Sequence, residues 1–402
     1  MFTLAFRNIF RHKVRTGLTS AAIIFGVIGL IISGGFVHDT FIQLGEAVIH
    51  SQLGHIQIYK TGYYSKGSRS FHEYLVPDPE KVNQATKTIP EIDDVMSRLN
   101  FAGLLNNGKA DLSIVGEGVE PDKEAKLGTF MKFIAGRPLS DKDVNGIVIG
   151  EGLAESLQLK PGDSVTLLLN TAEGSLNSAD FEVIGLFQSF SKDFDARSIR
   201  IPLAAAQDLL GAKGANAIVV VLKDTNTTDQ VFTELQKRLP SNAYELKKWD
   251  ELTDFYKKTI ELYRHQFGIL QTIIFIMVFL SVANSVNISM FERTGEFGTL
   301  MALGNRRNMV FRLALVENIL LGLIASTVGV VIGIGLALFI SHIGIPMPPP
   351  PNANSGYTAF IRVVPSVIAF AFTVGFMATI IACLFPAYKV TRMPAVEALR
   401  YN

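Results

Sequence analysis

Cysteine and charged residues are both scarce in this sequence. Cys383 is the only cysteine among 402 residues, so a disulfide-stabilised scaffold is excluded, and its apolar surroundings favour a small packed residue. Charged residues make up 18% of the chain, below the roughly 25% usual in soluble proteins. Because this shortage is concentrated in a few long stretches, it indicates membrane-spanning segments within a chain that is soluble elsewhere.

The motifs of nucleotide hydrolysis and of common hydrolases are absent from the sequence. It contains no G-x-x-x-x-G-K-[ST] phosphate loop, no G-x-S-x-G elbow and no H-E-x-x-H metal motif. Five possible metal ligands have spacings that fit no known site: His38, His50, His55, His72 and Glu73. We therefore expect no catalytic residue, metal or cofactor in this chain, and energy for any active process must come from a partner.

Four apolar stretches are long enough to cross a bilayer, which takes about 20 residues. The predicted transmembrane helices are 16–37, 265–291, 313–341 and 363–388. Residues 38–264 hold 25 Lys and Arg against 32 Asp and Glu, the charged fraction of a soluble domain, and their net negative charge disfavours nucleic-acid binding. The predicted fold class is therefore a polytopic α-helical membrane protein with four transmembrane helices and a large extracytoplasmic α+β domain inserted between helices 1 and 2.

Basic residues predict the orientation of the chain in the membrane. Lys and Arg are concentrated in residues 1–15, in the 292–312 loop and in the 389–402 tail, whereas the 342–362 loop holds only Arg362. We expect both termini and the 292–312 loop in the cytoplasm, and the soluble domain in the periplasm. The first apolar stretch is too long for a signal peptide, and residues 1–15 read as an amphipathic helix at the membrane interface.

The soluble region alternates between strand-like and helix-like patterns. Strands are expected at 55–59, 112–116, 146–150, 163–169, 180–187 and 217–223, and helices at 78–88, 151–158, 203–211 and 227–239. Such a mixture indicates an α+β domain of two lobes. Helical spacing continues to Val48 after the first membrane helix, and Glu251–Tyr263 leads directly into the second. Two stalk helices would thus join the domain to the membrane part.

Small and polar residues mark helix faces within the membrane. Ala325, Gly329, Gly333 and Ala337 recur at four-residue spacing, which allows a neighbouring helix to approach closely. In the second helix, serines and asparagines favour an interhelical partner, with a polar conduit as the alternative reading: Ser281, Ser285, Ser289, Asn284 and Asn287. We expect Glu317 to form an interfacial ion pair with Arg312 or Arg293.

The 292–312 loop has the pattern of a short amphipathic helix. Glu292 and Glu296 are one helical turn apart, as are Phe297 and Met301, and Gly304 ends the pattern. A short amphipathic helix along the membrane surface could transmit a push from a soluble partner protein. An ordinary amphipathic loop is the plainer interpretation.

The same loop carries a family resemblance. Its sequence Glu292-Arg293-Thr294-Gly295-Glu296-Phe297-Gly298-Thr299-Leu300-Met301-Ala302-Leu303-Gly304 resembles the E-R-x-x-E-[IF]-G-x-L-x-A-L-G signature of FtsX-like permeases of ABC transporters, the MacB-type (type VII) superfamily. Residues 4–9 and 386–400 also resemble that family. Residues 54–58 and the Pro-rich 346–351 stretch look most similar to the lipoprotein-releasing LolC/LolE group.

The resemblance implies a function and partners. The coupling helix that fits a separate cytoplasmic ATPase would be formed by Glu292, Arg293, Glu296, Phe297, Gly298, Leu300, Ala302, Leu303 and Gly304. Two ATPase copies would bind ATP and Mg²⁺, and a second permease chain, identical or related, would complete a complex in the bacterial inner membrane. The expected cargo is a lipoprotein or another amphiphile.

Two alternatives stay open within the family. One is a MacB-like tripartite export system with a periplasmic adaptor, and the other is an FtsX-like regulator that transports nothing and switches a cell-wall hydrolase or a sensor. The Pro-rich 346–351 stretch, expected to be polyproline II, fits either a stiff spacer or a ledge on which a partner docks.

Overall fold

The computed structural model describes residues 13–67, 71–127, 131–171, 173–350, 352–354 and 356–394. Most of the expected 1–15 amphipathic segment, and the C-terminal motif beyond Pro394, lie outside the described residues. The chain divides into two compact units. The helical unit comprises residues 1–42, 259–346 and 358–402, and the ectodomain unit comprises 43–258 together with 347–357.

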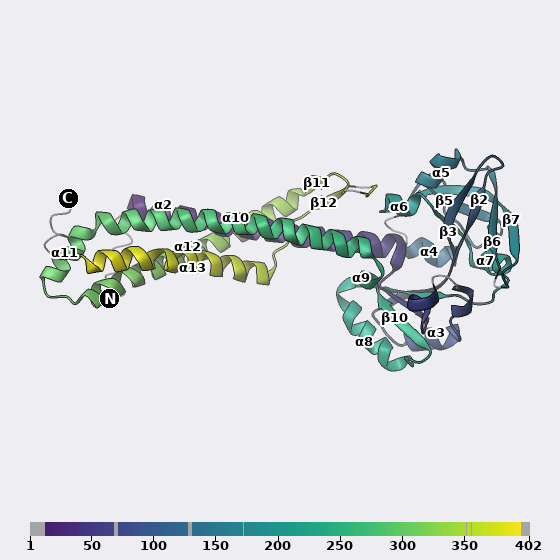
Figure 1. Cartoon of the computed structure of the whole chain (residues 1–402), viewed down its shortest axis with the longest axis horizontal. Helices are drawn as coiled ribbons and strands as arrows, with labels where there is room; N and C mark the ends of the chain where they lie inside the picture. Colours follow the sequence, from purple (N-terminus) through teal and green to yellow (C-terminus); the bar gives the residue numbers. More distant parts are fainter. Residues whose placement is uncertain are drawn as a thin grey trace. The chain divides into compact units, whose positions relative to one another are not determined.

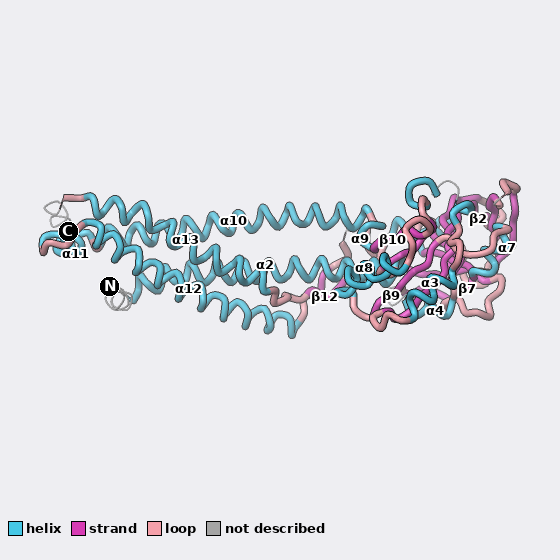
Figure 2. The backbone as a smooth tube through the Cα atoms, turned by 90° about the horizontal axis from the view of Figure 1, so that it is seen from below, coloured by secondary structure: helices cyan, strands magenta, loops and turns pink. Residues whose placement is uncertain are grey.

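The helical unit is built from four long helices that run side by side (Figures 1 and 2). They are α2 (Lys13–Val48), α10 (Asp254–Glu292), α12 (Arg307–Ile343) and α13 (Pro365–Arg392), with the short α11 (Thr294–Ala302) between α10 and α12. Each long helix has an apolar stretch long enough to cross a membrane. The predicted fold class of four membrane helices is thus confirmed.

Small residues bring α12 close to α2 inside this unit. A Cβ atom built on Gly329 would lie 3.0 Å from Cβ of Val27, and one on Gly333 would lie 2.9 Å from Cδ1 of Ile31. Ala325 and Ala337 lie on the same face of α12 and are also buried. The four-residue spacing therefore produces a close helix contact, as expected for small residues in membrane helices.

Two helices continue past the apolar stretches, as predicted for stalks. α2 extends to Val48 and is followed by the π-helical turn η1 (Ile49–Leu53). The second stalk differs from the prediction, because Glu251 belongs to a separate helix, α9 (Trp249–Leu252). Thr253 is extended, and its Oγ1 accepts a hydrogen bond from the Tyr256 backbone N–H at 3.2 Å, so it caps the start of α10.

One sheet of ten strands forms the ectodomain among the described residues. The strands are β1 (Ile56–Lys60), β2 (Ile92–Asn106), β3 (Asp111–Val119), β4 (Lys132–Gly136), β5 (Gly146–Gly150), β6 (Ser164–Asn170), β7 (Leu176–Gln188), β8 (Ser198–Pro202), β9 (Ala217–Leu222) and β10 (Tyr244–Lys248). Their order is β10-β1-β9-β2-β3-β8-β5-β7-β4, and β6 pairs with both β2 and β7. Two pairs, β3–β8 and β5–β7, are parallel.

The strands of this sheet contribute to two separate hydrophobic cores, which agrees with the two predicted lobes. One core packs β1 and β9 against α3 (Pro79–Lys87) and α8 (Thr228–Arg238). The other packs β5 to β8 against α5 (Glu151–Leu157) and α7 (Leu203–Leu210). Figure 1 shows α3 and α8 beside β10, with α5 and α7 in the other part of the ectodomain.

Strand β2 joins the two lobes. Its first half, up to Arg98, pairs with β9, and its second half, from Arg98 onward, pairs with β3 and β6. Arg98 therefore lies at the position where the strand passes from one lobe to the other. The predicted strands all correspond to observed ones, but β2 itself was not predicted.

The remaining elements are short. They are η2 (Tyr63–Gly67), η3 (Phe71–Tyr74), α4 (Pro121–Leu127), α6 (Lys192–Asp195), η4 (Thr225–Thr227), β11 (Ile345–Met347) and β12 (Tyr357–Ala359). β11 and β12 pair with each other in the connection between α12 and α13.

Candidate functional site

The connection between α10 and α12 holds the residues that the sequence singled out for coupling. Helix α10 ends at Glu292, and Arg293 follows in a non-helical conformation with φ −98° and ψ 9°. Helix α11 then begins at Thr294. The prediction that Glu292 and Glu296 share one helix is therefore wrong, because the chain changes direction at Arg293 to bring its side chain inward.

Arg293 is the centre of this connection. Its side chain is 4% exposed, Nε donates to Glu296 Oε2 at 3.0 Å, and Nη1 donates to Glu317 Oε1 at 2.6 Å. The guanidinium also lies over the Phe297 ring, 5.1 Å from its centre. Burial alone would lower the pKa of Arg293, but the charges and hydrogen bonds of Glu317 and Glu296 outweigh it and raise that pKa. Of the two expected partners of Glu317, Arg293 is therefore the one observed.

Helix α11 has one buried face and one exposed face. Phe297 is 1% exposed, and Thr294 and Gly298 are also buried. The exposed face holds Glu296, Thr299 and Ala302, and Leu303, directly after the helix, is 77% exposed. The helix ends as predicted near Gly304, which has φ +90° and donates its N–H to the Met301 carbonyl at 3.1 Å.

This geometry fixes the short helix to its neighbours. The Arg293 to Glu317 ion pair joins the start of α11 to α12, and the Phe297 side chain packs into the helical core. The start of α11 is therefore held to α12 by a buried, charge-assisted contact. The remaining predicted coupling residue, Leu300, is half-buried on the packed side.

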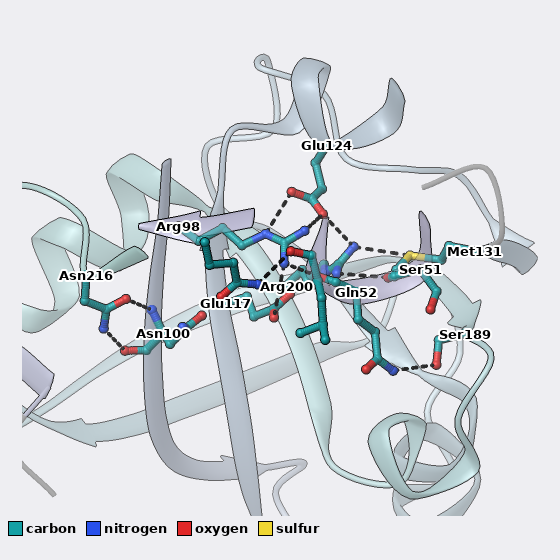
Figure 3. Close-up of polar contacts among 12 residues, drawn as sticks. Ser51, Gln52, Arg98, Asn100, Glu117, Glu124, Met131, Ser189, Arg200 and Asn216 are labelled. Carbon is teal, nitrogen blue, oxygen red and sulfur yellow. Dashed lines mark hydrogen bonds and ion pairs between the residues drawn. The ribbon is translucent and has the colours of Figure 1, made fainter. Parts of the chain in front are cut away.

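A second polar site lies in the ectodomain, and the sequence analysis did not anticipate it. The ectodomain cluster consists of Arg98 on β2, Glu117 on β3, Glu124 on α4 and Arg200 on β8 (Figure 3). Arg98 binds Glu124 through both Nε and Nη2, the former at 3.1 Å. Arg200 Nε donates to Glu117 Oε2 at 2.8 Å, and its Nη1 lies 3.2 Å from Glu124 Oε1. Both arginines are 2% exposed.

The ectodomain cluster also holds the end of the α2 stalk. Arg98 Nη1 donates to the carbonyl of Gln52, and Arg200 Nη2 donates to the carbonyl of Ser51 at 3.5 Å. These carbonyls belong to η1, where the last turn of a helix leaves acceptors without intrahelical donors. Two buried cations at the negative end of a helix are electrostatically favourable. Figure 3 shows both side chains reaching Ser51 and Gln52.

Opposite charges in the ectodomain cluster shift the pKa values of Arg98 and Glu117 against the effect of burial. Burial alone would lower the pKa of Arg98, but Glu124 and Glu117 raise it overall. Burial alone would raise the pKa of Glu117, but Arg200 and Arg98 hold it below its usual value. The cluster thus links β2, β3, β8 and α4 to η1 at the junction of the two lobes.

A weak signal for this cluster exists in the sequence. Arg200 interrupts an apolar strand, and Glu117 stands between Gly116 and Gly118. Both glycines are needed, since a Cβ on Gly116 would lie 2.1 Å from the Phe101 ring and one on Gly118 would lie 2.4 Å from Cβ of Ala206. Single charges in buried strands must find partners, but the sequence does not identify which ones.

Two of the ectodomain histidines have structural partners. His55 is 1% exposed, its Nδ1 accepts from the Leu222 N–H at 3.1 Å, and its Nε2 lies 3.0 Å from Thr225 Oγ1. His50 pairs with Glu46 at 3.2 Å. Across the described ranges, no group of three or more His, Cys, Asp or Glu side chains is arranged to hold a metal ion.

Comparison with known proteins identifies two family segments. Residues 16–238 match the MacB-like periplasmic core domain, and residues 268–395 match the FtsX-like permease C-terminal domain. An uncharacterised ABC transporter permease of Methanocaldococcus jannaschii is 26% identical over all of this chain and 97% of its own length. The lipoprotein-releasing transmembrane protein LolE of Haemophilus influenzae is 22% identical over 77% of this chain and 78% of its own length.

Longer proteins and solved structures also match. The macrolide export ATP-binding/permease protein MacB of Hyphomonas neptunium is 22% identical over 98% of this chain, which spans 60% of that protein. The periplasmic region of MacB from Actinobacillus actinomycetemcomitans aligns with 52% of this chain and 94% of its own length, at 17% identity and a TM-score of 0.38. Because the family model of the periplasmic core covers more than half of the sequence, this chain belongs to the MacB-type family of ABC transporter permeases.

Proposed function

We propose that this chain is the transmembrane subunit through which a separate ATPase moves the ectodomain. The observation that carries the proposal is the geometry of α11, which is fixed to α12 by the buried Arg293 to Glu317 pair while Leu303 and Ala302 face outward. An exposed apolar edge on a rigidly held short helix suits a groove in a partner protein. Two copies of that partner would bind ATP and Mg²⁺ and perform the hydrolysis.

The proposed movement has two routes along continuous helices. α10 carries motion from the α11 end to its start at Asp254, and α2 carries motion to Val48 and η1. At η1 the stalk carbonyls are bonded to Arg98 and Arg200, so a shift of the stalk end acts directly on both lobes of the sheet. Mechanical transmission of this kind needs no polar path through the membrane.

A second permease chain is expected to pack on α10. Among the membrane helices of this chain, α10 is the least buried within the fold. Its exposed residues include Ser281, Asn284 and Asn287, whose polar groups are costly to leave facing lipid. Ser285, by contrast, is hydrogen-bonded to Thr19 of α2 inside the same chain. Pairing through α10 would bury the exposed amides.

The proposed function of the complex is the release of a lipoprotein or another amphiphile. The similarity to LolE, a transmembrane protein of a lipoprotein-releasing system, supports this cargo class. The scarcity of ionisable residues in the membrane helices also suits a cargo handled outside the membrane core rather than in a central channel. The similarity to MacB supports macrolide-type export equally, so this is the competing function.

The proposed location is the bacterial inner membrane. Both termini and α11 would face the cytoplasm, where the ATPase is, and the ectodomain would face the periplasm. The distribution of Lys and Arg in the short segments supports this orientation. Accessibility of single cysteines placed at Leu303 and at Lys109 to a membrane-impermeant thiol reagent tests it directly.

Affinity purification from native membranes tests the proposed complex. The tagged chain should retain an ABC ATPase, a second permease chain and an acylated protein, each identified by mass spectrometry. An adaptor in place of an acylated protein would favour export, and a wall hydrolase or a sensor kinase would favour regulation. Recovery of the permease without any ATPase, under conditions that preserve known complexes, would refute the coupling function.

Charge reversal on α11 tests the coupling surface. Glu296→Lys places a cation beside Arg293 and should reduce retention of the ATPase, and Glu292→Lys, at the end of α10, should reduce it as well. Glu155→Lys, on the exposed surface of α5, is the matched control and should leave retention unchanged. Equal retention by all three variants would exclude the assigned surface.

A further inference from the structure

The connection between α12 and α13 does not belong to a single unit. Residues 347–357 group with the ectodomain, although the helices on either side belong to the helical unit. The connection therefore leaves one unit and returns to it. Two sets of contacts, one in each unit, hold it in place.

The first set of contacts holds the connection to the α2 stalk within the helical unit. Asp39 of α2 is fully buried, and its carboxylate accepts from the Phe360 N–H at 2.8 Å and from Arg362 Nε at 2.7 Å. Ser341, near the end of α12, donates to the Ile361 carbonyl at 3.0 Å. A buried carboxylate with two donors, one of them charged, makes a strong local anchor.

The second set of contacts holds the connection to the sheet within the ectodomain unit. Ala353 forms a β-bridge with Ser191, and the Lys192 N–H donates to the Asn352 carbonyl at 3.0 Å. The Asn354 side chain donates both to Asp195 Oδ2 and to the Ser189 carbonyl, and Asp195 is itself 1% exposed.

The buried carboxylate at this second anchor has a specific role. Asp195 also accepts from the Ser189 N–H at 3.1 and 3.0 Å, so its two oxygens tie the Ser189 segment to Asn354. Ser189 Oγ in turn accepts from Gln52 in η1 at 3.4 Å. The anchor therefore lies one side chain away from the stalk end that Arg98 and Arg200 hold.

We propose that the α12–α13 connection is a permanently docked strap, with Asn354 and Asp195 as positioning residues, that transmits motion of α12 to the ectodomain in addition to the two stalks. This inference rests on the proposed function, because it needs an ATPase acting on α11. Five residues lie between Asn354 and Phe360, so the chain that joins the two anchors is short. On the other side, consecutive prolines stiffen the chain between α12 and Asn352. The Pro-rich stretch is then a stiff spacer within the strap, rather than a ledge for a partner.

Hydrogen–deuterium exchange on the full chain, in nanodiscs with its co-purified ATPase, tests the strap. In the wild type, vanadate trapping of ATP should change exchange both in α11 and in residues 189–196. The Asn352→Ala/Asn354→Ala variant should keep the change in α11 and lose at least half of the change in residues 189–196. Asn226→Ala removes an exposed amide bonded only to nearby Asp224, and it should behave as the wild type.

An engineered disulfide gives an independent test. Ser191 and Ala353 are bridge partners, and Cys383 is the only natural cysteine, so Ser191→Cys/Ala353→Cys should form one new bond. The oxidised protein should retain the full response in residues 189–196, with the reduced form of the same sample as its control. A response lost on oxidation would show that the connection must undock, and a normal response in the double-alanine variant would show that it transmits nothing. Either result overturns the strap, whereas absence of any response in wild-type α11 would refute the proposed function instead.

Discussion

Two buried arginine sites in this protein differ in how completely they are enclosed. Arg293 in the α10–α12 connection has one partner, Glu317, that is 13% exposed, and another, Glu296, that is 43% exposed. In the ectodomain cluster, Arg98 and Arg200 bind Glu117 and Glu124, whose side chains are 13% and 7% exposed. The first site is partly open at Glu296, whereas no side chain of the second is more than 13% exposed, and we call the second site closed for this reason.

The difference fits two separate tasks. A partly open ion pair can exchange a partner when another protein docks, because water and side chains can reach Glu296. A closed cluster has less freedom, since breaking a contact leaves a buried charge with fewer partners. We infer that the α11 site responds to the ATPase, while the ectodomain cluster keeps the stalk end and both lobes moving as one body.

The largest effect is expected from opening the closed cluster. Arg98→Met should lower the free energy of unfolding by about 3–5 kcal/mol, because Glu124 loses one of its two buried arginine partners and the Gln52 carbonyl loses its arginine donor. The measurement is denaturant unfolding of the full chain, followed by fluorescence of Trp249, the single tryptophan. Lys126→Met, which breaks an exposed pair with Asp94, is the control and should cost about 0–1 kcal/mol. Similar costs for both would mean that the cluster is not closed in solution.

Replacing Arg293 should lower the stability of the chain less than replacing Arg98, and it should weaken binding of the ATPase more. Arg293→Gln should lower stability by about 1.5–3 kcal/mol, the usual range for hydrogen bonds to charged groups. Retention of the ATPase should fall further than in Arg98→Met, measured by quantitative co-purification at matched expression. If Arg98→Met releases the ATPase and Arg293→Gln does not, the two assigned tasks are reversed.

Lowering the pH should reduce the stability of the ectodomain near the end of the α2 stalk. Burial lowers the pKa of His55 from 6.5 to about 4, so the neutral ring contributes stability that is fully present above pH 6.5 and is lost as the pH falls toward 4. Between pH 7.5 and pH 5 the loss from this residue should be about 2 kcal/mol. His55→Gln should remove that part of the pH dependence in the Trp249 unfolding assay. An unchanged pH profile in the variant would show that His55 is not the titrating group.

The smallest effect on stability is expected from the contact between α12 and α2 in the helical unit. Gly333→Leu should destabilise the chain by about 1–3 kcal/mol, toward the low end because the nearest atom is the flexible tip of Ile31. Gly335→Leu, in the same helix with no neighbour within 4 Å of its Cβ position, is the matched control. Thermal unfolding in one lipid composition compares them, and equal melting temperatures would place the Gly333 face toward lipid.

Membrane helices and the α11 pattern could be predicted from sequence for a simple physical reason. Apolar length, four-residue spacing of small residues and the position of basic residues are local properties that a bilayer imposes on every chain. Glu317 also had few possible partners, because an ionised group near the membrane must pair with a nearby cation. The short helix ending at Gly304 followed from the same local rules.

The tertiary structure alone decided where distant residues meet. Strand β2 shows no regular alternation of buried and exposed residues, because its two halves belong to different lobes, and so periodicity did not reveal it. The break at Arg293 was also hidden, since an inward-turned arginine needs Glu317, 24 residues away. The ectodomain cluster and the docking of residues 352–354 against Asp195 join segments that lie far apart in the chain. Composition therefore determined which parts of this protein meet lipid and which meet water, whereas packing determined which distant residues meet within each unit.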